Sequence, residues 1–201
     1  MTRKWDWAAW IGVASVAALA AGVLVLAHDG RGLRGVTLAT QSVARVAFVF
    51  FWLAYAGGGL ARLLGPAFDG LARQRRAFGL AFAAALLVHL AFVAWLFHIS
   101  YRPPVSNGVI LAFGIGAAAI YALALASLKP VRGLLGDRLW RFLSAAGLEY
   151  VALLFFRDFA LLPLEYRVGH PLFYTPFAIA IVAGAALRWS APFWRRQRAA
   201  V

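Results

Sequence analysis

The stretch ARQRRAFGLAFAAALLVHLAFVAWLFHIS, residues Ala72–Ser100, decides the fold of this chain. Its arginines end abruptly at Arg76, and an apolar run follows that is long enough for the roughly 20 residues a membrane-crossing helix needs. One imidazole, His89, lies inside that run, and a second, His98, lies at its far end. The pattern predicts a transmembrane helix, and an ionisable, metal-binding side chain within it requires a functional explanation.

The whole chain has the composition of an integral membrane protein, so a lipid bilayer is its expected environment. Of 201 residues, 64% are hydrophobic and 13% are charged, whereas soluble domains are about 45–50% apolar and about 25% charged. The length suits a single domain over residues 1–201. Because the chain has no cysteine, it cannot form disulfides, thiolate metal sites or iron–sulfur clusters.

Six apolar segments predict an all-α bundle of six transmembrane helices. Each segment is near the required length, and backbone groups in lipid must be satisfied within the segment, which favours helices over strands. Proline and glycine clusters, such as SYRPPVSNG after the third segment, separate them. The expected helices run over residues 7–27, 37–64, 77–98, 108–128, 139–162 and 173–189.

The basic residues indicate how the bundle is oriented. If the N-terminus is inside, 14 of the 20 Lys and Arg residues fall on the inner side and 6 on the outer side. Cytoplasmic loops are enriched in Lys and Arg, so both termini are expected in the cytoplasm. The arginines flank apolar runs and form no patch interleaved with exposed aromatics, so we expect no nucleic-acid partner.

The first apolar segment also has features of a secretory signal peptide. A basic MTRK precedes it, and the small residues Ala18–Ala20 could mark a cleavage site. However, the apolar run continues to Ala27, which is longer than a signal peptide usually requires. A retained membrane helix is the expected outcome.

His89 lies about 20 Å along its predicted helix from the inner end, and Phe78, Phe82 and Ala85 share its face. It could ligate a haem or a metal, or it could hydrogen-bond a neighbouring helix. The other three histidines lie at outer helix ends, where a solvated side chain is ordinary. They are His28, His98 and His170.

Two further charged residues lie deep in predicted helices. Arg45 is about eight residues into the second segment, where it suits a haem propionate or a pairing acid. Glu149 is the most deeply placed acid, and pairing with an arginine is expected for it, with a proton relay or quinone contact as the alternative.

Small residues predict close helix packing. Gly57–Gly59 thin the second helix, and Gly114 with Ala118 has small-xxx-small spacing in the fourth. No motif for hydrolysis, phosphate cradling or dinucleotide binding is present, so we expect no catalytic residue. Any hydride chemistry must then lie on another chain.

Three stretches together resemble the ferric reductase-like transmembrane family. They are SVARVAFVFFWLAYAGGGLARLLG, RRAFGLAFAAALLVHLAFVAWL and SLKPVRGLLGDRLWRFLSAAGLEYVALLFF. The family includes the haem-binding membrane subunit of the periplasmic methionine sulfoxide reductase system. The likeness covers roughly residues 42–156, and Arg45, the Arg75–Arg76 pair with Gly79, and His89 match the family's pattern.

The resemblance implies a six-helix bundle with b-type haem in an inner membrane of bacterial type. Such a membrane oxidoreductase subunit passes electrons from quinol or a flavoprotein to a periplasmic redox partner or a metal. By this resemblance His89 would be an axial haem ligand, and Arg45 would lie near the outer end of the haem.

The fifth segment departs from the family, which has an Arg-Leu-His step where this chain has Arg138-Leu139-Trp140. The family's additional histidine in the third helix is also missing. A second ligand would then come from His28, His98, His170 or a partner chain, or be absent. The alternative is a haem-less relative that serves as a structural or assembly subunit of a membrane complex. A small transporter is a third possibility, supported only by Glu149.

Overall fold

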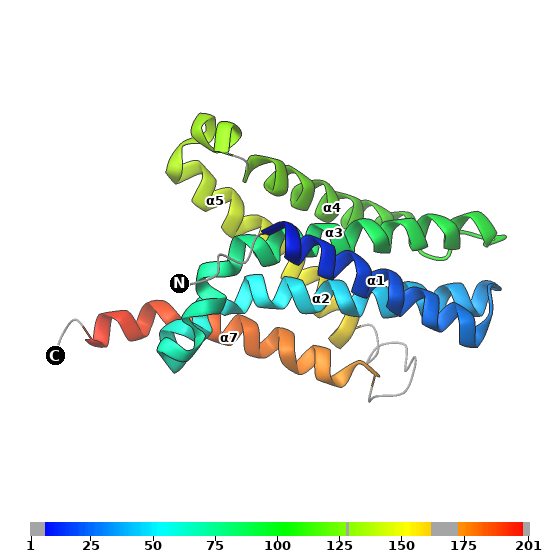
Figure 1. Ribbon diagram of the computed structural model, residues 1–201, viewed down its shortest axis with the longest axis horizontal. Coiled ribbons are helices and arrows are strands. Elements are labelled where there is room, and N and C mark those ends of the chain that lie inside the picture. Colours follow the sequence, from blue (N-terminus) through cyan, green and yellow to red (C-terminus); the bar gives the residue numbers. More distant parts are fainter. Residues whose placement is uncertain (1–6, 128, 162–172, 199–201) are drawn as a thin grey trace. The chain divides into compact units, whose positions relative to one another are not determined.

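The computed structural model describes residues 7–127, 129–161 and 173–198, and within these ranges every regular element is helical (Figure 1). The prediction of an all-α protein is therefore confirmed for the described part. The elements are α1 (Trp7–Asp29), α2 (Leu33–Leu64), the 3₁₀ turn η1 (Pro66–Phe68), α3 (Asp69–Ile99), α4 (Asn107–Ala126), α5 (Lys129–Phe156), the single π turn η2 (Arg157–Leu161) and α7 (Thr175–Arg198).

Five of the described helical segments are long and apolar enough to cross a membrane, as expected of a multi-pass membrane protein. They are Trp7–Asp29, Leu33–Leu64, Pro66–Ile99, Asn107–Ala126 and Gly136–Leu161. The apolar part of α7, Thr175–Ser190, is shorter.

Hydropathy locates five of the six predicted spans as candidate membrane helices, but it does not locate their helix ends. α3 begins at Asp69 rather than Ala77, and α2 begins at Leu33 rather than Thr37. The added residues of α3 include Ala, Arg and Gln, which favour helix whether or not lipid surrounds them. An apolar run therefore marks only part of a helix, and polar turns extend beyond it.

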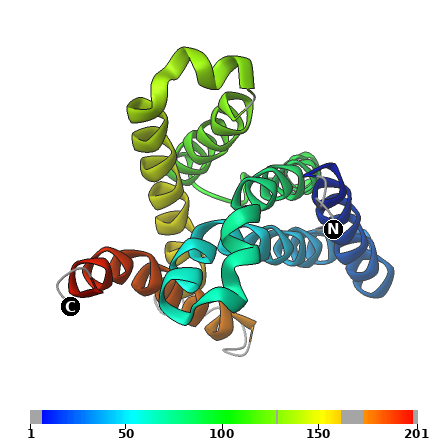
Figure 2. The same ribbon diagram turned by 60° about the vertical axis from the view of Figure 1, so that its left-hand side comes forward.

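α5 begins at Lys129 rather than Leu139, and it contains a break at Gly136. Gly136 has φ 67° and ψ 157°, a backbone conformation that glycine adopts far more readily than residues with a Cβ. Figure 2 shows the first turns of α5 running in a different direction from the rest of the helix. The candidate membrane span accordingly starts at Gly136.

The chain groups into two compact units, which we describe separately. The first unit comprises Met1–Phe51 and Arg76–Leu125, and the second comprises Trp52–Arg75 and Ala126–Val201. α2 and α3 each contribute residues to both units. The expectation of one domain over residues 1–201 stays a prediction.

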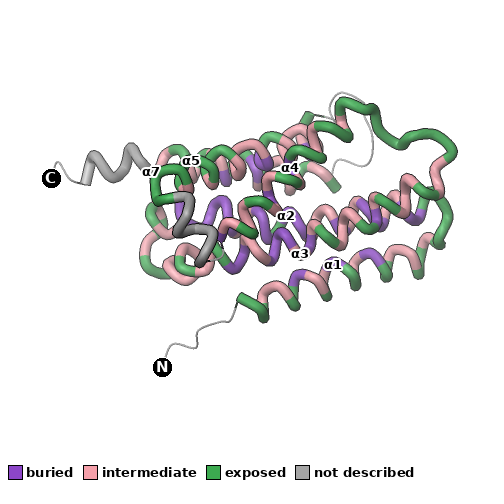
Figure 3. The backbone as a smooth tube through the Cα atoms, turned by 90° about the horizontal axis from the view of Figure 1, so that it is seen from above, coloured by how far each residue is buried: buried purple, intermediate pink, exposed green. Residues whose placement is uncertain are grey.

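The first unit has a core of small and aromatic side chains. Buried positions concentrate on α2 and α3 (Figure 3). The rings of Trp10 and Phe78 have centroids 4.9 Å apart, and those of Phe51 and Phe82 are 5.4 Å apart. Alanines allow the helices to approach between these rings. Fully buried ones are Ala14, Ala18, Ala39, Ala81 and Ala85.

In the second unit, glycines bring α2 and α7 into contact. A Cβ built on Gly59 would lie 2.6 Å from the carbonyl oxygen of Leu187, and one on Gly184 would lie 2.9 Å from Nε1 of Trp52. The same indole Nε1 donates a hydrogen bond to the Ala180 carbonyl oxygen at 2.6 Å. The predicted role of Gly57–Gly59 in close packing is thus confirmed at Gly59.

Close packing of α4 through Gly114 and Ala118 stays a prediction. Gly114 and Ala118 are exposed, and a Cβ on Gly114 would meet nothing within 4 Å. The buried glycine of α4 is Gly116. Spacing alone does not decide which side of an alanine-rich helix faces a neighbour, because small residues occupy every side of it.

Candidate functional site

α3 holds His89 against α2 within the first unit. Nδ1 of His89 lies 3.2 Å from the carbonyl oxygen of Thr40. A carbonyl oxygen only accepts hydrogen bonds, so Nδ1 must carry the proton in this contact. In the neutral ring Nε2 then carries the lone pair. The contact therefore fixes the tautomer that presents Nε2 as a metal-binding nitrogen.

The neighbours of His89 on α3 are largely apolar. Its side chain is half-buried, ten residues before the helix ends at Ile99, which is about 15 Å along the axis. Phe82, Ala85 and Phe92 share its face at helical spacing and are all buried.

Part of this face is already filled by other side chains of the first unit. The ring of Phe82 packs edge-on against Phe51. The ring of Phe92 lies so close over Gly22 that a Cβ there would overlap it. The face is thus a well-packed core on either side of His89.

Arg45, the other predicted site residue, lies on α2 in the same unit. It is five residues beyond Thr40, which corresponds to about 7.5 Å along the helix. Its side chain is half-buried. The structure therefore places the His89 imidazole and the Arg45 residue on neighbouring helices at levels that differ by less than two helical turns.

The other two described histidines, His28 and His98, lie at helix ends. His98 is exposed at the end of α3, as predicted, and His28 is exposed at the end of α1. His28 Nδ1 lies 3.2 Å from Oδ2 of the adjacent Asp29. His170 lies outside the described residues. Within the described ranges, no three His, Cys, Asp or Glu side chains gather as metal ligands.

Glu149 of α5 lies at the centre of a polar cluster in the second unit. Nε of Arg188 donates a hydrogen bond to Oε1 at 2.6 Å, and the Tyr55 hydroxyl donates one to Oε2 at 2.8 Å. Nε1 of Trp189 lies 3.4 Å from Oε1. The predicted pairing of Glu149 with an arginine is confirmed. This cluster joins α2, α5 and α7.

Burial makes these contacts important for the second unit. Tyr55 is 1% exposed, and the Arg188 guanidinium lies 4.9 Å from the centroid of its ring. The side chains of Arg188 and Glu149 are 19% and 32% exposed. A carboxylate in an apolar setting is costly unless its oxygens are bonded, and here each oxygen accepts a hydrogen bond.

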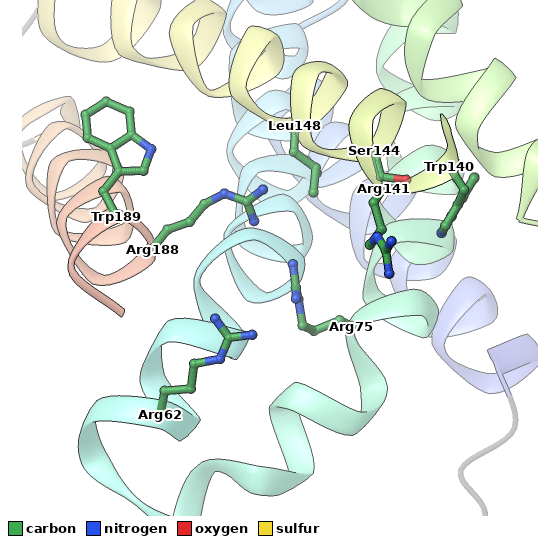
Figure 4. A pocket seen from close by; sticks show the side chains of 8 residues that line it. All are labelled: Arg62, Arg75, Trp140, Arg141, Ser144, Leu148, Arg188 and Trp189. Atoms are coloured by element: carbon green, nitrogen blue, oxygen red, sulfur yellow. The ribbon is translucent and has the colours of Figure 1, made fainter. Parts of the chain in front are cut away.

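Beside this cluster the second unit has a cavity of about 510 Å³ (Figure 4). Four arginines line it, from α2, α3, α5 and α7. From the sequence, these four arginines are predicted only to be positive charges on the inner side. The sequence does not predict that they share a cavity, because no sequence spacing relates residues on four different helices. They are Arg62, Arg75, Arg141 and Arg188.

Comparison with known proteins identifies no relative: no protein-family model, curated protein or solved structure matches this chain.

Proposed function

We propose that this chain is a multi-pass membrane protein that binds b-type haem through Nε2 of His89 and transfers electrons across the bilayer. The observation that carries the proposal is the hydrogen bond from His89 Nδ1 to the Thr40 carbonyl oxygen at 3.2 Å. Metal-ligating histidines typically donate their second ring nitrogen to such an acceptor, which sets both tautomer and ring orientation. The proposed topology has six crossings with both termini in the cytoplasm.

Among the described residues, the donor chemistry would supply haem with one ligand. A haem macrocycle provides four nitrogens of its own, so the protein needs to supply one side chain, and Nε2 of His89 suits that role. His28 and His98 are exposed at helix ends. We therefore propose a single histidine ligand from the described part of the chain.

When bound, b-type haem supplies a one-electron redox centre. The Thr40 carbonyl oxygen orients the His89 ring. The Arg45 guanidinium would provide a positive charge for a propionate carboxylate.

A second candidate function is a structural or assembly subunit without haem. Its support is the filled core of the first unit, where Phe82 and Phe92 already pack on Phe51 and Gly22. A bundle that needs no cofactor would be stable with this packing alone. The titration below separates the two candidates.

The test is a titration of the haem-free, detergent-purified protein with haemin, followed at the Soret band. The proposal predicts a shift that saturates at one haem per chain, and loss of that shift in the His89→Ala variant. His98→Ala is the matched control, because it removes an exposed histidine from the same helix. Helical content by circular dichroism verifies that both variants fold. Equal saturation of His89→Ala and wild type would overturn ligation by His89, and no shift in the wild type would favour the structural subunit.

A further inference from the structure

The cavity of the second unit concentrates positive charge. Four of the side chains that line it are arginines, of which Arg188 is paired with Glu149, and none of the described residues lining it is acidic. Guanidinium groups that share a cavity repel one another, and a bound anion offsets this repulsion. Figure 4 shows the side chains of Arg62, Arg75 and Arg188 extending toward the same space.

Two of these arginines are fixed by the protein. Nε of Arg75 donates a hydrogen bond to the Ala54 carbonyl oxygen at 2.9 Å, and Nε of Arg188 donates one to Glu149 at 2.6 Å. A guanidinium has five N–H donors, so each retains donors beyond these contacts. The fixed guanidinium groups are therefore held in position for a further acceptor.

The other two arginines are available to a ligand. Arg62 and Arg141 are exposed, and neither has a hydrogen bond or ion pair to another of the residues that the structure describes. Arg62 lies in the last turn of α2. The cavity thus combines two guanidinium groups fixed by the fold with two that can close on a ligand.

Ser144 provides independent evidence that the cavity binds a ligand with hydrogen-bonding atoms. Oγ of Ser144 is buried and has no hydrogen-bond partner among the described residues, and Ser144 lines the cavity. Leaving a buried hydroxyl unsatisfied carries a free-energy cost, which an oxygen-rich ligand in the cavity would remove. The serine and the arginines therefore indicate the same kind of ligand.

From these contacts we infer that the cavity binds a phosphate group, carried by an anionic phospholipid or present as free phosphate. The planar guanidinium fork binds phosphate oxygens in pairs, which distinguishes arginine from lysine at such sites. Trp140 and Trp189 also line the cavity, and tryptophan is enriched where membrane meets water. Basic pockets between membrane helices hold the headgroups of acidic lipids in this way. The inference does not depend on haem.

The experiment compares two probes on the full-length protein in detergent. Dioleoyl phosphatidylglycerol, with dioleoyl phosphatidylcholine as the neutral-headgroup control, is counted as bound lipid by native mass spectrometry. Inorganic phosphate is titrated by calorimetry. The test variant is Arg62→Gln with Arg141→Gln. The control is Arg73→Gln with Arg138→Gln, which removes the same charge from two exposed residues that do not line the cavity.

We expect saturable binding of at least one of the two probes to the wild type. This binding should fall at least tenfold in the Arg62/Arg141 variant and not in the control. Retention of phosphatidylglycerol alone identifies a lipid headgroup as the ligand, and binding of inorganic phosphate identifies a free anion. An equal loss in both double variants would show general charge attraction instead of a site, and it would overturn the inference. No binding of either probe by the wild type would also overturn it. Unchanged binding in the Arg62/Arg141 variant would do so as well. Melting temperatures without ligand verify that both variants fold.

Discussion

His89 and Thr40 are joined across two helices by a hydrogen bond of 3.2 Å, from an imidazole nitrogen to a main-chain carbonyl oxygen. Replacing the Thr40 side chain leaves that acceptor in place, because the oxygen belongs to the backbone. The ring of His89 is therefore oriented by the fold of α2 itself. Such an arrangement fixes the orientation of the imidazole without requiring a second polar side chain in the core.

The Glu149 cluster predicts a graded loss of stability. Glu149→Ala leaves the Arg188 guanidinium and the Tyr55 hydroxyl without their acceptor, whereas Tyr55→Phe removes one hydrogen bond and leaves the ion pair. We expect a loss of about 1–3 kcal/mol for Glu149→Ala and about 1 kcal/mol for Tyr55→Phe. Thermal or denaturant unfolding in detergent measures both, and equal stability of Glu149→Ala and wild type would show that the cluster contributes nothing.

Gly59 is predicted to tolerate no side chain. The Cβ of Gly59→Ala would lie 2.6 Å from a main-chain oxygen of α7, which cannot move as a side chain can. We expect a destabilisation of about 1–3 kcal/mol from this overpacking. Gly114→Ala is the matched control: it has open space and should gain up to about 1 kcal/mol from helix propensity. Unfolding midpoints that fall equally in both variants would contradict the close approach of α2 and α7.

The proposed topology can be tested with single cysteines, because the natural chain has none. Ser106 lies just before α4 and Ala67 lies between α2 and α3, and both are exposed. A membrane-impermeant maleimide added to intact cells should label Ser106→Cys and leave Ala67→Cys unlabelled until the membrane is opened. The reverse pattern would invert the orientation, and labelling of both from outside would show that α3 does not cross.

The sequence predicts most of the helices because their apolar runs are long and nearly uncharged. It also predicts the pairing of Glu149, since a carboxylate at that depth needs a partner. It does not identify that partner. Arg188 follows Glu149 by 39 residues on a different helix, so no local spacing connects them.

Helix ends and helix faces are harder to predict from this composition. α3 extends eight residues toward the N-terminus beyond its apolar run, because arginine and glutamine favour helix outside lipid as well. Gly114 and Gly59 look equivalent in sequence, yet only Gly59 meets a neighbouring backbone. In an alanine-rich helix the hydrophobic pattern is nearly uniform around the axis, so it does not specify which side is packed.

The most direct test of haem ligation by His89 is the reduced-minus-oxidised absorbance spectrum of protein produced with ample haem, recorded for the wild type and His89→Ala. Our proposal predicts α and β bands in the wild type and their loss in the variant. A featureless wild-type spectrum, or bands that survive unchanged in His89→Ala, would contradict it.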